Sequence, residues 1–215
     1  MREPQEKVPF DFILNKFSNM NTIEINKNSL VPYHQEKAAF CIKLMGIKYY
    51  IHHPDGETFT EYGSRVDSYV IKTILLRYLV NGKGAMPSGR YITFKEIRDG
   101  QVYYPNFYKR TIMRLARLYD DHPNIFKKPL SIPIKEHDKG DYSFSFEFLP
   151  HVIFLFVLYK RDEEFPANAN ILMDAAIQHY FNAEDLAVIV DVAIHFFVNK
   201  GKIQHGLGMY DMGRE

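Results

Sequence analysis

The sequence predicts an α+β fold, with an antiparallel or mixed sheet built from two hairpins and helices packed on it. Two pairs of apolar or alternating segments are each joined by a tight turn, as β-hairpins are. Segments with a helical apolar period lie around these pairs and do not alternate with single strands. Apolar residues make up 46% of the 215 residues, including 17 Phe and 15 Tyr, which is enough for a large core.

The hairpins are predicted at two places in the chain. AAFCIKL and IKYYIHH flank Met45 and Gly46, and Gly accepts the positive φ of a tight turn. YSFSFEFL alternates like a half-buried strand, IFLFVLY is continuously apolar like a central strand, and residues 149–151 separate them. ILMD follows as a short strand or turn.

Five segments carry helix signals. DFILNKFSNM has one apolar face, whereas the polar stretch 19–32 is expected to be irregular. We expect Ser64 to begin a helix that ends at a left-handed Gly82, TFKE to cap a short helix, Pro105 to open an amphipathic helix, and Asn182 to cap a final helix. The final helix should bury six apolar side chains: Leu186, Ile189, Val190, Ala193, Phe196 and Phe197.

We expect one domain over residues 1–215. It comprises an N-terminal helix and irregular lead-in over 1–34, a core over 35–200, and a flexible tail over 201–215. The single cysteine, Cys41, excludes a disulfide within the chain and a Cys-ligated cluster built from this chain alone. The N-terminus has no apolar signal-peptide region, and HVIFLFVLY is too short to span a bilayer. A cytoplasmic location without a membrane partner is therefore expected.

The net charge of +1 disfavours nucleic acid as a partner, but the charge is unevenly distributed. Residues 90–135 carry an excess of Lys and Arg, and residues 136–200 carry an excess of Asp and Glu. These segments either form two oppositely charged faces or neutralise each other within the fold.

Three stretches together resemble a known family. They are GRYITFKEI, LPHVIFLFVLYKRDEEFPANANILMD and HYFNAEDLAVI, and the sequence is similar here to the family catalogued as domain of unknown function 3786 of anaerobic bacteria and archaea. The matching positions are residues 162–166, 171–174 and 184–188, within a resemblance that covers residues 38–198. Tyr91 and Tyr159 stand where the family often has Trp.

Some members of that family are labelled putative iron–sulfur cluster proteins, and some carry an extra Cys-rich domain of the kind found in corrinoid proteins. The resemblance therefore implies a link to anaerobic one-carbon or corrinoid metabolism. This chain lacks the Cys-rich domain, so the resemblance does not imply a bound cluster. The family has no known catalytic residues, so none is carried over.

The acidic block after the apolar strand is the sharpest polar feature. Asp162, Glu163 and Glu164 precede Phe165–Pro166, and crowded carboxylates suit acid–base chemistry or a hard divalent cation. We expect Asp162 or Glu164, with Asp174 nearby, to line a cleft as a ligand or cation site. The alternative is a solvated loop whose acids cap turns or pair with neighbouring basic side chains.

The predicted helix after Pro105 carries a basic stripe of Arg110, Arg114 and Arg117, which are candidates to bind an anion. Tyr103, Tyr104 and Tyr108 lie nearby and offer rings for stacking on a planar ligand. The alternative is a solvated helix face. Asp191 and His195, four residues apart on the final helix, form either a metal-related pair or a polar stripe.

The sequence identifies no cofactor, no metal site and no catalytic signature. It favours a binding or accessory protein for an anionic, tetrapyrrole-like ligand or for a partner protein. A small enzyme that uses the acidic loop, and a protein that binds nucleic acid through the basic helix, are the alternatives.

Overall fold

The N-terminal helices place their apolar sides on one four-stranded antiparallel sheet. We describe a computed structural model, in which residues 5–126 and 132–203 are placed; the expected tail lies mostly outside this range. The chain forms two compact units: residues up to Ala85 with His179–Phe181, and Met86–Gln178 with Asn182–Ile203. The expectation of one domain over 1–215 stays a prediction.

The first unit contains helices α1 (Lys7–Asn19), α2 (Thr22–Ser29) and α3 (Tyr69–Asn81), and strands β1 (Tyr33–His34), β2 (Ala39–Leu44), β3 (Ile47–His52) and β4 (Thr58–Thr60). The strands follow one another in the order β1-β2-β3-β4. The predicted β2–β3 hairpin is confirmed, and its turn places Met45 and Gly46 at φ of 48° and 80°. Phe17 of α1 packs on Phe40 of β2, with ring centroids 6.0 Å apart, which joins helix and sheet in one core.

Three sequence expectations about the first unit are wrong. The stretch 19–32 contains helix α2, whose first turn is capped by the Asn21 side chain and whose Ile25 is fully buried. Helix α3 begins after Ser68, because the backbone at Ser64 is already hydrogen-bonded to Thr60 of β4. Gly82 ends α3 with a φ of −52° and is not left-handed.

The second unit contains strands β5 (Tyr91–Thr93), β6 (Ile134–His137), β7 (Tyr142–Leu149), β8 (Val152–Tyr159) and β9 (Asn168–Asp174). It also contains helices α4 (Gly100–Phe107), α5 (Met113–Asp121) and α6 (Ala183–Val198), with a π-helical turn, η3 (Tyr108–Ile112), joining α4 to α5. All strand pairs are antiparallel, in the order β5-β9-β8-β7-β6. The α+β class is thus confirmed, although the two predicted hairpins belong to two separate sheets.

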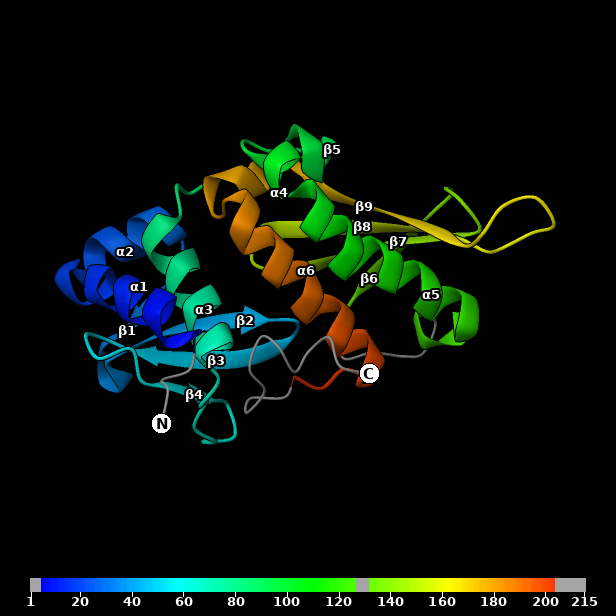
Figure 1. Cartoon of the computed structure of the whole chain (residues 1–215). Coiled ribbons are helices and arrows are strands. Elements are labelled where there is room, and N and C mark those ends of the chain that lie inside the picture. The colour runs from blue at the N-terminus through cyan, green and yellow to red at the C-terminus, as the bar shows by residue number, and fades with distance from the viewer. Residues whose placement is uncertain (1–4, 127–131, 204–215) are drawn as a thin grey trace. The chain divides into compact units, whose positions relative to one another are not determined.

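Helices α4, α5 and α6 lie on one face of the second sheet (Figure 1). The predicted β7–β8 hairpin is confirmed, and ILMD forms the end of β9. All six apolar side chains predicted to be buried on the final helix are buried. Asn182 caps α6, and it forms a capping box with Asp185.

The helix predicted to open at Pro105 begins five residues earlier, at Gly100. Pro105 lies inside α4, where its ring removes one amide hydrogen bond without ending the helix. The π-helical turn follows within three residues and changes the direction in which later side chains project. TFKE does form the predicted capping box, between Thr93 and Glu96, but it caps a 3₁₀ turn.

Candidate functional site

The basic stripe of the second unit is anchored on a buried carboxylate. Asp191 of α6 is 2% exposed, and it accepts hydrogen bonds from Arg110 Nη2 at 2.8 Å and from Arg114 Nη1 at 2.7 Å. The alternative of a simply solvated helix face is therefore wrong for these two arginines. A carboxylate buried in an apolar helix requires a cationic partner. Arg110 and Arg114 supply two such partners to Asp191.

One carboxylate balances only one of the two guanidinium groups, so the cluster of Arg110, Arg114 and Asp191 carries a net positive charge. The Arg110 side chain is 29% exposed and the Arg114 side chain is 16% exposed, so part of this charge faces solvent. Arg117, one turn further on, is exposed. A guanidinium group has five N–H donors, so Arg110 retains donors beyond the one given to Asp191.

Tyrosine rings lie on the same helix. Tyr103 precedes Arg110 by seven residues, about two turns, and 39% of its surface is exposed. Tyr104 and Tyr108 occupy a neighbouring side, with ring centroids 5.8 Å apart, and Lys95 Nζ lies 4.1 Å from the Tyr104 centroid. We call Tyr103, Arg110, Arg114 and Arg117 the arginine–tyrosine face.

The opposite charges of the two segments are partly neutralised within the fold. Besides the Asp191 cluster, Arg161 pairs with Asp120 and lies 3.8 Å from Asp121. The Asp191 pairs join basic residues of 90–135 to an acidic residue of 136–200, as the neutralising interpretation expects. The Arg161–Asp120 pair instead joins the minority charges of the two segments.

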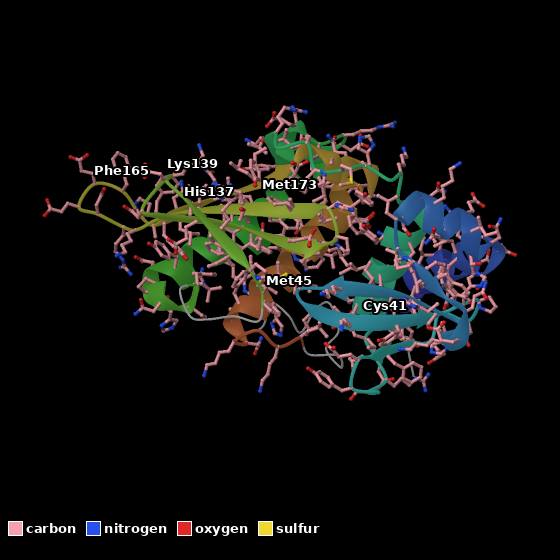
Figure 2. All side chains as sticks on the ribbon, turned by 180° about the vertical axis from the view of Figure 1, so that it is seen from behind. Cys41, Met45, His137, Lys139, Phe165 and Met173 are labelled. Carbon is pink, nitrogen blue, oxygen red and sulfur yellow. The ribbon has the colours of Figure 1, made fainter. Side chains whose placement is uncertain are left out.

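The acidic block forms a turn at the tip of the β8–β9 hairpin. Asp162 Oδ1 accepts the backbone N–H groups of Glu164 and Phe165 at 2.9 and 2.7 Å, an arrangement typical of an Asx turn. Glu163 and Glu164 are exposed, and Phe165 is 65% exposed. Figure 2 shows Phe165 on the loop where this hairpin extends beyond the rest of the sheet.

Asp174 lies at the other end of β9, about 20 Å from the hairpin loop at ~3.3 Å per residue. The structure thus separates Asp174 from Asp162 and Glu164, which corrects the hypothesis that the three line one cleft. Within residues 5–126 and 132–203, no three His, Cys, Asp or Glu side chains group in a way that could hold a metal ion.

Asp174 instead holds the segment before β5. Its buried carboxylate accepts from the backbone N–H groups of Ser88, Gly89 and Ala176 and from the Ser88 hydroxyl, at 2.7–2.9 Å. Burial alone would raise the pKa of Asp174, but these hydrogen bonds outweigh it and lower the pKa below its ordinary value. Asp174 therefore acts as a structural acceptor.

The lowered pKa of Asp174 makes its contribution to stability dependent on pH. The stabilisation is fully present above the pKa of the unfolded chain, near 3.9, and is lost as the pH falls through the lowered pKa of the folded state. Asp174→Asn leaves the Gly89 N–H facing an amide donor, and we expect a loss of about 1–3 kcal/mol at pH 7.

Denaturant unfolding of both proteins between pH 7 and pH 2.5 tests this expectation. The difference in unfolding free energy should be constant above about pH 5 and should shrink below pH 4. The exposed Asp138→Asn is the control and should show little difference at any pH. A difference for Asp174→Asn that persists to pH 2.5 would contradict the ionised acceptor.

Asp191 was expected to pair only with His195 on the same helix, and both side chains are buried. The ion pairs with Arg110 and Arg114 were not predicted. The signal for them is one acid in an apolar helix together with two arginines spaced by four residues on another helix. The remaining predicted residue, Arg117, lies on the exposed side of α5 as expected.

No helix in the described parts of the chain is both long and apolar enough to cross a bilayer. No curated protein and no solved structure matches this chain. One family model does match, over residues 22–196, which is most of the chain and includes all three stretches on which the resemblance was based. The chain belongs to the family described as a domain of unknown function (DUF3786).

Proposed function

We propose that this protein binds an anionic ligand with a planar group, through the arginine–tyrosine face of the second unit. The observation that carries the proposal is the sharing of Asp191 by Arg110 and Arg114 at 2.8 and 2.7 Å. The shared carboxylate holds two guanidinium groups in position while leaving them a net positive charge. Guanidinium groups held in this way lose less side-chain entropy when they bind an anion than free ones do.

The exposed ring of Tyr103 offers a surface for the planar group of the ligand. Tyr103 lies about 10 Å along the helix from Arg110 and offers an exposed ring for stacking. A tetrapyrrole with carboxylate side chains has both the planar surface and the negative charge. The link to corrinoid metabolism that the family resemblance implies suggests tetrapyrrole-derived compounds as the class of ligand. We place this binding role in the cytoplasm, where a chain with the single Cys41 needs no disulfide.

A porphyrin tetracarboxylate is a suitable probe, and its absorbance shift on titration reports binding. We expect Arg117→Gln and Tyr103→Ala each to weaken binding by about 2- to 10-fold, because each removes one contact worth about 0.5–1.5 kcal/mol. Both residues leave the Asp191 ion pairs intact, so stability should be nearly unchanged. Affinity should also fall with increasing salt.

Lys160→Gln is the matched control, because it removes one exposed positive charge from the same unit outside the arginine–tyrosine face. Equal binding by the wild type, Arg117→Gln and Tyr103→Ala would refute this face as the site. Native mass spectrometry and absorbance of protein purified without oxygen from its own host would then identify the ligand that the protein does carry.

A further inference from the structure

The second sheet is curled so strongly that side chains of its two edge strands meet on the face opposite the helices. Tyr91 lies on β5 and His137 on β6, which are the two outermost strands of the five. Four strand spacings would hold these strands about 19 Å apart in a flat sheet. The ring centroids of Tyr91 and His137 are only 6.4 Å apart, and the two ring planes are inclined at 80°. The edges therefore fold toward each other over this face.

The curl encloses polar groups as well as apolar ones. Ser143 and Ser145 of β7 are buried there, opposite Val157 and Leu155 of β8, which are also buried. The helix-facing side of the same strand carries Phe144 and Phe146, both packed on Phe197 of α6. The serines thus lie on the side away from the helices.

Both serine hydroxyl groups are tied to the β6 edge. Ser143 Oγ donates to the His137 carbonyl oxygen at 2.8 Å and accepts the Lys139 backbone N–H at 3.1 Å. Ser145 Oγ lies 2.8 Å from His137 Nε2, a hydrogen bond that fixes the imidazole ring. His137 is half-buried, so the rest of its ring remains accessible.

Two lysines add positive charge beside this imidazole. Lys135 is directly opposite Ser145 in the β6–β7 ladder, and Lys139 lies in the turn that follows β6. Both side chains are exposed, and no carboxylate of the described residues forms an ion pair with either ammonium group. Figure 2 shows His137 and Lys139 close together on the face of the sheet that is turned toward the viewer.

We propose that Lys135, His137 and Lys139 form a binding site for a phosphate-type oxyanion at the closed edge of the second sheet. Two ammonium groups and a fixed imidazole supply positive charge and N–H donors along one edge of the sheet, and phosphate groups are bound by such groups. The site is separate from the arginine–tyrosine face, which lies on helices that cover the other side of the sheet (Figure 1).

The protonation of His137 links this site to pH. Burial lowers the pKa of His137 first, and the charges of Lys135 and Lys139 lower it further. Among the described residues, Tyr91 of β5 and Ser145 of β7 also contact the ring. A bound oxyanion stabilises the charged imidazolium, so it raises this pKa, and the affinity for an oxyanion of constant charge increases as the pH falls through that pKa.

The test is an NMR titration of the His137 ring in the whole protein, with the signal assigned by its loss in His137→Asn. Inorganic phosphate is the probe, and sodium chloride at matched ionic strength is the reference, because salt alone screens the two lysines. We expect phosphate to raise the pKa of His137 by about one unit more than chloride does.

Variants locate the effect. Lys135→Gln combined with Lys139→Gln should abolish the difference between phosphate and chloride, whereas Lys160→Gln should preserve it. An equal response to both salts, or a difference that survives the double replacement, would refute the site. A larger response to acetate than to phosphate would overturn the phosphate assignment in favour of a carboxylate ligand.

Discussion

Replacing Asp191 with Ala should lower the free energy of unfolding by about 3–5 kcal/mol. The substitution removes the carboxylate that Arg110 and Arg114 share, and both arginines are partly buried. Alanine has a high helix propensity, so the loss cannot be attributed to a weakened α6. Chemical denaturation followed by circular dichroism measures the change.

The surface substitution Asp121→Ala is the matched control, because Asp121 lies 3.8 Å from the exposed Arg161 and should contribute less than about 0.5 kcal/mol. Arg110→Gln combined with Arg114→Gln should also destabilise the protein, since it leaves the buried Asp191 unpaired. This expectation replaces the solvated-face interpretation of the stripe, which predicts almost no change. A loss below about 1 kcal/mol for Asp191→Ala would show that the cluster is not desolvated.

The second large effect is expected at the centre of the second unit. Phe197 of α6 is fully buried. Its ring centroid lies 5.0–6.1 Å from the ring centroids of Phe144, Phe146 and Phe156 in the sheet and of Phe126 in the 3₁₀ turn Pro123–Phe126. Phe197→Ala should cost about 3–5 kcal/mol, because the cavity would be lined by rigid rings that cannot collapse into it.

Phe197→Leu retains most of the apolar volume and should lose less than Phe197→Ala in the same denaturation experiment. Phe165→Ala, on the exposed hairpin loop, removes the same side chain at a site where 65% of it faces solvent. It should change stability by no more than about 0.5 kcal/mol. Similar losses for Phe197→Ala and Phe165→Ala would show that the aromatic cluster is not the core of this unit.

The sequence alone determined those elements whose signals are local. The β2–β3 and β7–β8 hairpins depend on alternating or apolar runs around short turns, and α6 depends on its Asn182 cap and its apolar period. Each of these signals lies within a few residues of the structure it predicts. The α+β class and the buried face of α6 follow from them.

The tertiary structure decided where local signals compete or where partners are distant in sequence. Helix α2 is polar and gains its stability from packing Ile25 into the core, and α3 begins after Ser68 because β4 already uses the backbone at Ser64. Neither outcome can be derived from propensity, since both depend on contacts made by other segments.

The same reason explains the candidate sites. Asp174 is distant from Asp162 because the extended strand β9 lies between Asp174 and the hairpin loop. No residue pattern reveals that the backbone at Ser88 needs the Asp174 carboxylate as an acceptor. Arg110 meets Asp191, 81 residues away, only when α6 packs beside the π-helical turn. A buried charged group destabilises the fold unless an opposite charge lies beside it. Which residue supplies that charge is decided by the tertiary structure when the two residues are distant in sequence.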